Sequence, residues 1–264
     1  MPVITGLTQA KEQRAQESLS LTISRRYERL YRQEIAKAMN EAAANRNNYG
    51  RLQGIFFTHK QNIEKILNRN WNVAAQSFGG RILRGAQKSY KKFETKDIFT
   101  VSPTPTFERM TRNWINENGA QKVTEISGTT KDQTQAIINS VINEAIKDGL
   151  SEDETQRLLL SEMQSKAAVL ARYRAGVISR TETSAASQAA NHNAAKATGL
   201  PLRKKWKANL DGRERDSHEH VNGQIKRMDE DFIVGGSRLK HPSDPHGEAK
   251  EVINCRCVEL IILD

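Results

Sequence analysis

The stretch INCRCVELIILD, residues 253–264, holds the only two cysteines of the chain, Cys255 and Cys257, with one arginine between them. Its β-branched and apolar residues predict a strand, and this is the strongest strand signal in the sequence. In a strand, a spacing of two residues places both side chains on one face, with Cα atoms roughly 6.6 Å apart. The structure around this stretch therefore depends on what two neighbouring thiols do.

Two thiols on one strand face have four interpretations, which the cysteines alone leave open. A disulfide would close a very small ring and distort the strand. A reactive dithiol would be favoured by a CxxC motif at a helix N-terminus, and the spacing here is CxC. The cysteines could also pack as small hydrophobic residues in a core. A metal site, in which zinc would take two thiolates and one or two imidazoles, needs further ligands. Candidates of the right type are His218, His220, His241, His246, Asp211 and Asp216.

Upstream of this stretch the sequence predicts a small α+β module. RKKWKANL, residues 203–210, is strand-like with Trp206 as a core residue, and a turn follows at LDG. QIKRM, residues 224–228, and DFIV, residues 231–234, are short strand candidates. We therefore assign residues 179–264 to one C-terminal α+β module.

Residues 1–100 predict an elongated helical hairpin. Gly and Pro are absent between Leu7 and Tyr49, and apolar residues recur there at helical separations. Gly50 and Gly54 are the expected stop signals of this first helix. A second helix is expected from about Thr58 to about Lys92, interrupted or kinked at Gly79-Gly80.

Residues 101–178 predict further helices that lead into the module. Pro103 and Pro105 indicate a loop, and a short helix around 107–118 should end at Gly119. An apolar stripe over 137–146 ends at Gly149. Ser151 and Glu154 fit a capping box that opens the next helix, and another helix should run from about Ser165 to Gly199. The predicted fold class is α+β, with an elongated, mainly helical N-terminal region and a small C-terminal α+β module.

The charge of the chain is uneven. Residues 179–264 hold 14 basic and 13 acidic residues, which leaves 27 basic and 18 acidic residues, a net charge of +9, in residues 1–178. Such an excess attracts polyanions, above all nucleic acid, although a solvated basic helix surface explains it equally well. No apolar run is long enough to span a membrane, and the first 30 residues hold no secretory signal. We therefore expect a protein made in a reducing cytoplasm, with no membrane partner.

The ordered residues of the last third resemble the phage Mu F-like minor head proteins, which are head morphogenesis proteins of tailed bacteriophages. The resemblance covers about Gly149 to the end. It is carried by Arg180-Thr181-Glu182, Trp206, Asp211, Arg213, Arg215, His218, Asn222-Gly223, Phe232, Pro242, Asp244 and Asn254-Cys255-Arg256-Cys257.

The resemblance implies a structural protein of the phage head rather than an enzyme, with no small-molecule substrate. It implies a place inside the head near the portal, after assembly in the host cytoplasm. The implied partners are the portal protein and the major capsid or scaffolding protein. The basic charge of residues 1–178 adds nonspecific double-stranded DNA as an expected partner. His218 lies in the family-like motif DGRERDSH, so zinc held by Cys255, Cys257 and His218 is the one cofactor hypothesis. Related domains also precede toxin modules, which we do not expect here because the chain ends seven residues after Cys257.

A rival function is a metal-dependent nuclease built on Asp211, Asp216, His218 and His220. Carboxylates and imidazoles beside a basic body would suit metal-assisted phosphodiester hydrolysis. However, the segment RERDSHEHVNG contains no HExxH motif, and the zinc deaminase pattern fails because the two cysteines are separated by one residue instead of two.

Overall fold

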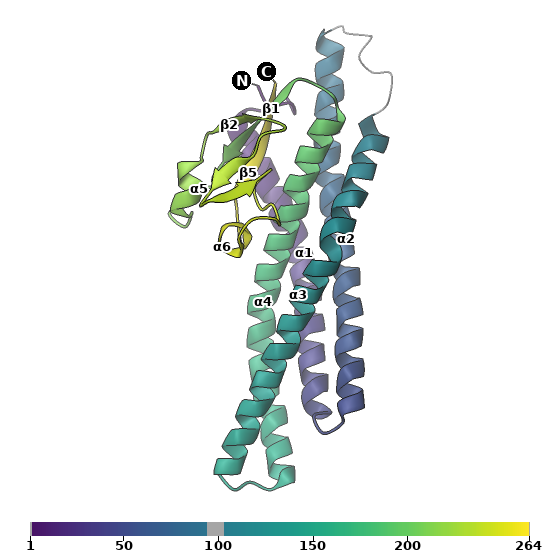
Figure 1. Cartoon of the computed structure of the whole chain (residues 1–264), viewed down its shortest axis with the longest axis vertical. Helices are drawn as coiled ribbons and strands as arrows, with labels where there is room; N and C mark the ends of the chain where they lie inside the picture. The colour runs from purple at the N-terminus through teal and green to yellow at the C-terminus, as the bar shows by residue number, and fades with distance from the viewer. Residues whose placement is uncertain (1, 94–102, 264) are drawn as a thin grey trace. The chain divides into compact units, whose positions relative to one another are not determined.

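The computed structural model describes residues 2–93 and 103–263. Four long helices are followed by a small region of short strands and helices (Figure 1). The fold class predicted from the sequence, mainly helical with a C-terminal α+β module, is confirmed. The long helices are α1 (Gln9–Ala44), α2 (Tyr49–Phe93), α3 (Pro103–Lys147) and α4 (Glu152–Ala197).

The break between α1 and α2 lies earlier in the chain than Gly50 and Gly54, where the sequence predicted it. The helix ends at Ala44, and the side-chain Oδ1 of Asn48 accepts a hydrogen bond from the backbone N–H of Arg51 at 3.0 Å. Asn48 therefore caps the start of α2, as short polar side chains do. Gly50 and Gly54 lie inside the new helix, so their prediction as stop signals was wrong.

Glycines inside α2 make close approaches rather than breaks. The helix is continuous through Gly79-Gly80, where an interruption was predicted. A Cβ atom at Gly79 would lie 2.1 Å from the ring of Phe107, and one at Gly85 would lie 2.5 Å from the carbonyl oxygen of Ile4. The cost of glycine in a helix, about 1 kcal/mol, is offset here by the segments that pack against its bare backbone.

The loop and the short helix predicted after residue 100 are replaced by a single long helix. Residues 100–102 of the predicted loop lie outside the described residues, but Pro103 and Pro105 belong to the first turn of α3. Proline is tolerated there because the first N–H groups of a helix have no intrahelical acceptor. Gly119, predicted to end a short helix, is internal to α3.

The predicted stop and start between α3 and α4 are confirmed. Gly149 has a φ of 67°, the left-handed conformation that glycine adopts easily. Ser151 and Glu154 form the capping box: the Ser151 N–H donates to Glu154 Oε2 at 2.8 Å, and the Glu154 N–H donates to Ser151 Oγ at 3.4 Å. The two helices predicted beyond this point are one, α4, and the chain turns after it at Gly199, which has a φ of 68°.

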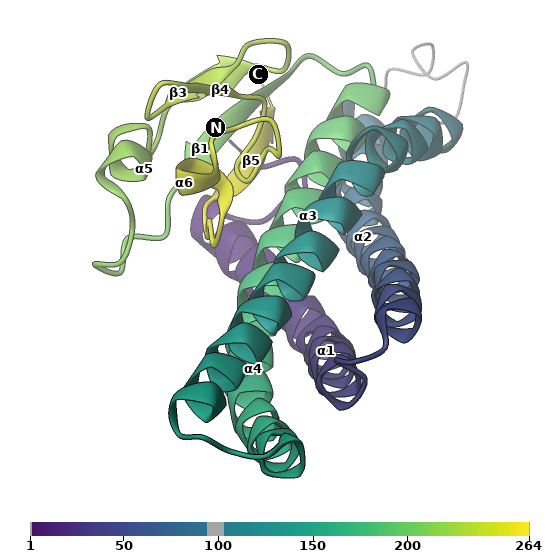
Figure 2. The same cartoon turned by 60° about the horizontal axis from the view of Figure 1, so that its bottom comes forward.

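The C-terminal module contains a three-stranded antiparallel sheet with the order β2-β1-β5 and a separate hairpin of β3 and β4. Figure 2 shows this hairpin with α5 and α6 beside the sheet. The three upstream strand predictions are confirmed, whereas β4 and both short helices were not predicted. The elements are β1 (Leu202–Lys207), α5 (Asp216–His220), β2 (Ile225–Arg227), β3 (Phe232–Val234), β4 (Ser237–Leu239), α6 (Ala249–Val252) and β5 (Val258–Leu263).

The chain forms two compact units, each assembled from separate segments. The first unit consists of residues 1–24, 70–117 and 180–264, and the second unit consists of residues 25–69 and 118–179. The three-domain division made from the sequence, 1–100, 101–178 and 179–264, stays a prediction.

In the first unit, the two ends of the chain meet at the sheet (Figure 1). Val3 bridges Ile262, and the Ile4 N–H donates to the carbonyl oxygen of Ile261 at 3.0 Å. Gln16 of α1 donates to the backbone carbonyl of Glu259, and Gln188 of α4 accepts from the N–H of the same residue. Side chains of α1 and α4 thus hold β5 in place.

The second unit consists of helical segments with a buried arginine. Arg174 donates to Thr130 Oγ1 at 2.6 Å and to the carbonyl oxygen of Ile126 at 3.0 Å. Burial lowers the pKa of Arg174 to about 10, so the guanidinium stays charged at neutral pH. None of the described helices has an apolar stretch that could cross a bilayer.

Candidate metal centre

The segment that carries the two cysteines is not the continuous strand that its composition predicted. Residues 249–252 form α6, and Asn254 follows with a φ of 56°. Cys255 and Cys257 lie in the connection before β5, which begins at Val258. The prediction of a shared strand face was therefore wrong, but both cysteines are buried, and neither is in a disulfide.

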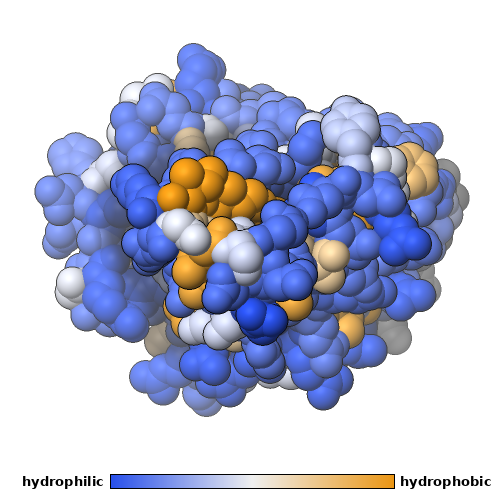
Figure 3. Space-filling view, turned by 90° about the horizontal axis from the view of Figure 1, so that it is seen from below, coloured by the Kyte–Doolittle hydropathy of each residue, from blue (hydrophilic) through white to orange (hydrophobic). Residues whose placement is uncertain are grey.

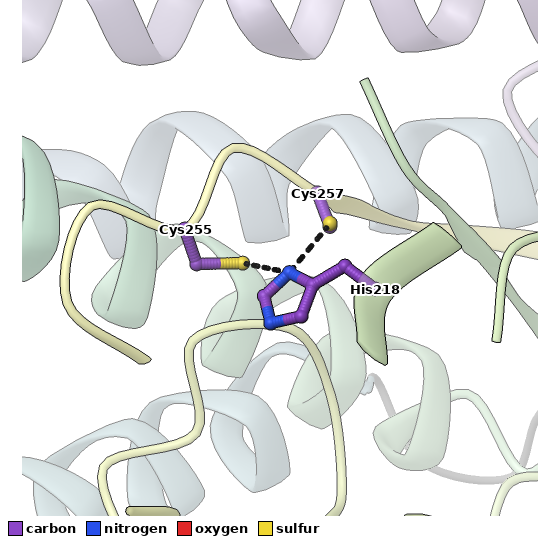
Figure 4. A group of neighbouring side chains, drawn as sticks. All are labelled: His218, Cys255 and Cys257. Atoms are coloured by element: carbon purple, nitrogen blue, oxygen red, sulfur yellow. Dashed lines mark hydrogen bonds between the residues drawn. The ribbon is translucent and has the colours of Figure 1, made fainter. Parts of the chain in front are cut away.

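His218 of α5 points between the two thiols (Figure 4). Its Nδ1 lies 3.3 Å from Sγ of Cys257 and 3.8 Å from Sγ of Cys255. The ligand atoms of these three side chains all lie within 4.8 Å of one another. All three residues are buried in the core of the module, and the ring of Trp206 meets the imidazole of His218 edge-on at 5.7 Å.

A buried carboxylate contacts the opposite edge of the imidazole. Nε2 of His218 lies 3.1 Å from Oε2 of Glu251, which also accepts a hydrogen bond from Ser217 Oγ at 2.7 Å. Nε2 of His218 thus faces a carboxylate that can accept its N–H, while Nδ1 faces the two sulfur atoms. Sequence reasoning missed Glu251, since no spacing rule links it to His218.

The two thiols do not ionise independently. A hydrogen bond from Cys257 lowers the pKa of Cys255, and His218 adds to this effect. The same contact with Cys255, together with burial, raises the pKa of Cys257. The first of the two thiols to ionise therefore loses its proton easily, and the remaining thiol then holds its proton strongly. This is expected of two acidic groups that share one buried site.

Residues of the family-like motif hold the cysteine segment in position. Arg256, between the two cysteines, makes two hydrogen bonds with the carboxylate of Asp211. These hydrogen bonds and those of Arg213 keep the pKa of Asp211 below its ordinary value. On the other side, Arg180 donates to Asn254 Oδ1 at 3.1 Å, and Thr181 Oγ1 accepts from the Asn254 N–H at 3.0 Å. The motif therefore has a structural explanation.

Of the further ligand candidates named from the sequence, none joins this group. Asp216 and His220 are exposed, Asp211 is engaged by arginines, and His246 pairs with Asp244. His241 is buried beside His192. Among the described residues, the group of His218, Cys255 and Cys257 is the one cluster of ligand side chains close enough for a metal ion. The constellation of four residues that a nuclease would need is not brought together.

Comparisons with known proteins identify the protein family of this chain. The family model described as Phage Mu protein F like protein matches residues 136–260. Minor head protein GP7 of Bacillus phage SPP1 is 30% identical over 228 residues, which cover 82% of this chain and 70% of GP7. The chain therefore belongs to the phage Mu F-like minor head proteins, as its motif indicated.

Two other relatives show how far the similarity reaches. The uncharacterized protein YqbB of Bacillus subtilis (strain 168) is 30% identical over 217 residues, and the chain spans 66% of its length. An NAD(+)–arginine ADP-ribosyltransferase, EFV of Enterococcus faecalis, is 33% identical over 90 residues, only 18% of that enzyme. The match leaves most of the enzyme uncovered and carries no activity to this chain. No solved structure matches the chain.

Proposed function

We propose that this protein is a structural component of the phage head that binds the portal and acts in head morphogenesis, DNA packaging or DNA ejection. The similarity to minor head protein GP7 carries the proposal. It extends over 228 residues, many more than the 136–260 match, and so includes much of the helical region as well as the module. On this proposal the protein is located inside the head near the portal and is not an enzyme.

Exposed apolar side chains on the second unit support a protein partner. On α4, Val169 and Tyr173 are separated by one helical turn and are 70% and 71% exposed. Figure 3 shows a face of the molecule that is mostly hydrophilic, so that exposed apolar side chains are the exception on it. Large apolar residues clustered on an exposed surface mark interaction sites.

Coexpression with a portal protein tests this proposal. The chain should copurify with the portal, and replacing Val169 and Tyr173 together with serine should weaken the complex. Gln164→Ala, on the same helix and exposed, is the matched control and should leave it intact. A wild-type chain that ignores the portal at micromolar concentration would refute portal binding, and parallel coexpression with major capsid or scaffolding protein would then identify the alternative partner.

Nonspecific binding of double-stranded DNA is a second candidate, supported by the distribution of charge. Residues 25–69 hold ten basic and four acidic residues, whereas residues 118–179 hold seven basic and eight acidic residues. In the first segment Arg25, Arg29 and Arg32 are exposed on one face of α1 and form no ion pair with a described acidic residue. A phosphate backbone could bind along this stripe.

Retardation of duplex DNA at several salt concentrations tests the second candidate. Affinity should fall steeply with salt, and replacing Arg25, Arg29 and Arg32 with alanine should reduce the salt slope by about one unit for each lost phosphate contact. Replacing Lys131, Lys147 and Arg157 removes the same charge elsewhere and should have little effect. An equal loss of DNA affinity in both variants would show that overall charge, and not the three arginines of α1, determines binding. Cleavage of plasmid DNA in the presence of Mg²⁺ or Mn²⁺ would instead support the nuclease hypothesis.

A further inference from the structure

The buried group of His218, Cys255 and Cys257 has the geometry of a zinc site. Zinc bonds of about 2.3 Å to sulfur and about 2.0–2.1 Å to nitrogen in a tetrahedron place these ligand atoms about 3.6 Å apart. The two Nδ1–Sγ distances, 3.3 and 3.8 Å, lie on either side of that value. An ion could therefore enter with only small movements of the three side chains.

Glu251 prepares the imidazole for such an ion. Metal-bound histidines almost always donate their second N–H to a carboxylate or carbonyl oxygen, which fixes the tautomer and orients the ring. The 3.1 Å contact between Nε2 and Glu251 supplies this arrangement. The backbone leaves room for the carboxylate at Gly235, which has a φ of 56° and where a Cβ atom would lie 2.1 Å from Glu251 Oε1.

If the cysteines only packed as neutral core residues, the positions of His218 and Glu251 beside them would have no explanation. Two thiols could fill the space beside Trp206 and Phe232 without a partner. A core that only needed small hydrophobic groups would not gain from an imidazole and a buried carboxylate, since burying polar and charged groups costs free energy unless they are compensated. A divalent cation bound to the two thiolates would give the buried imidazole a ligand role and the buried carboxylate a role in orienting that imidazole.

The described chain supplies three ligand atoms, and a cavity lies beside them. Zinc in proteins takes four ligands, and sites with three protein ligands keep one position for water. Both cysteines line a cavity of about 170 Å³, together with Ser184, Gln188 and Asn209. This cavity could hold the water molecule that completes such a site.

We propose that His218 Nδ1, Cys255 Sγ and Cys257 Sγ bind one Zn²⁺ ion, with Glu251 as the positioning residue and the fourth position open to this cavity. The ion joins α5 to the segment before β5, two parts of the module that are distant in sequence. It stabilises the small module in the way that structural zinc stabilises other small domains. This site is independent of the portal and DNA proposals, and each can fail without the other.

Elemental analysis of the full-length chain, purified without a histidine tag, tests the proposal. We expect one zinc ion per chain, and cobalt substitution should give a thiolate-to-cobalt charge-transfer band. Cys257→Ser should abolish the band, whereas His220→Gln, which alters an exposed histidine on the same short helix, should leave zinc content and spectrum unchanged.

Two further measurements keep the proposal falsifiable if Cys257→Ser does not fold. Glu251→Gln should weaken zinc affinity about 10- to 100-fold in a competition with a chromophoric chelator. Cys255→His keeps a ligand at that position and should retain the metal with an altered spectrum. A wild-type chain that contains far less than one zinc ion, takes up no cobalt and melts identically with and without chelator would overturn the proposal.

Discussion

The C-terminal module and the second unit are stabilised in different ways. The module has a small core in which single residues are hard to replace: Trp206 and Phe232 pack edge-on at 5.3 Å beside the buried cysteines. The second unit buries the interchangeable side chains of long helices, among them Ile35, Ile63, Leu67, Val141, Leu159, Ala167 and Ala171. Many aliphatic combinations fill such a helical core equally well.

This difference explains why the residues that identify the family lie in the module and not in the second unit. In the module, Asp211, His218 and Asn254 each have a specific partner, so their order along the chain is a recognisable pattern. In the second unit, periodicity reveals helices but no individual residue identifies the protein.

The largest expected effect is on the core of the module. Trp206→Ala should lower the free energy of unfolding by about 3–5 kcal/mol, because it removes a fully buried indole. Urea denaturation measures the loss, and Leu210→Ala, at a half-exposed position of the same module, is the control. A loss of less than about 1 kcal/mol for Trp206→Ala would show that the module tolerates replacement as the helices do.

Arg174 is a buried residue of the second unit that has specific partners. Arg174→Ala should cost about 1.5–3 kcal/mol, since it removes charge-assisted hydrogen bonds to Thr130 and Ile126. Arg172→Ala, exposed on the same helix, should change stability by less than about 0.5 kcal/mol. Equal losses of stability in the two variants would mean that the buried hydrogen bonds of Arg174 contribute nothing to the free energy of unfolding. The second unit would then differ even more from the module, where single residues matter.

Glycine replacements separate open helix surface from close packing. Gly54→Ala should stabilise the protein by about 0.4–1 kcal/mol, because no atom lies within 4 Å of the added Cβ. Gly85→Ala, in the same helix, should instead destabilise it, since the new atom would meet the Ile4 backbone. Melting temperatures that rise for both variants would contradict the packing described for the first unit.

The smallest expected effect is on the pH dependence of the module. Burial alone would raise the pKa of Asp244, yet His241 and hydrogen bonds from Lys240 and His246 lower it below its ordinary value of 3.8. A lowered folded-state pKa means that the stabilisation is present above pH 3.8 and is lost as the pH falls below it. Asp244→Asn should remove this part of the acid sensitivity, and identical unfolding midpoints of the two proteins across pH 2–5 would count against it.

The sequence predicted local features better than packed ones. Gly149, Gly199 and the Ser151–Glu154 capping box were predicted correctly, because they act on neighbouring backbone groups. Gly79 was misinterpreted, since Phe107, which packs against its bare backbone, is distant in sequence and its packing overrides the local propensity. Gly119 was misinterpreted as well.

The candidate site was predicted in its residues but not in its geometry. Cys255 and Cys257 suggested a metal, and the family-like motif added His218, which the structure brings beside them. The strand assignment failed because the left-handed Asn254 separates a short helix from β5, and composition alone does not show such a turn. Glu251 and Gly235 could not be predicted, since their role exists only in the folded module.

The central claim is that this chain is a minor component of the phage head, and purified heads test it directly. Heads assembled from coexpressed portal, scaffolding and major capsid proteins together with this chain are isolated on a gradient and analysed by quantitative mass spectrometry. We expect the chain to sediment with the heads, in far fewer copies than the major capsid protein, and to be lost from heads assembled without the portal. A chain that stays at the top of the gradient while complete heads form would show that it is not a component of the head.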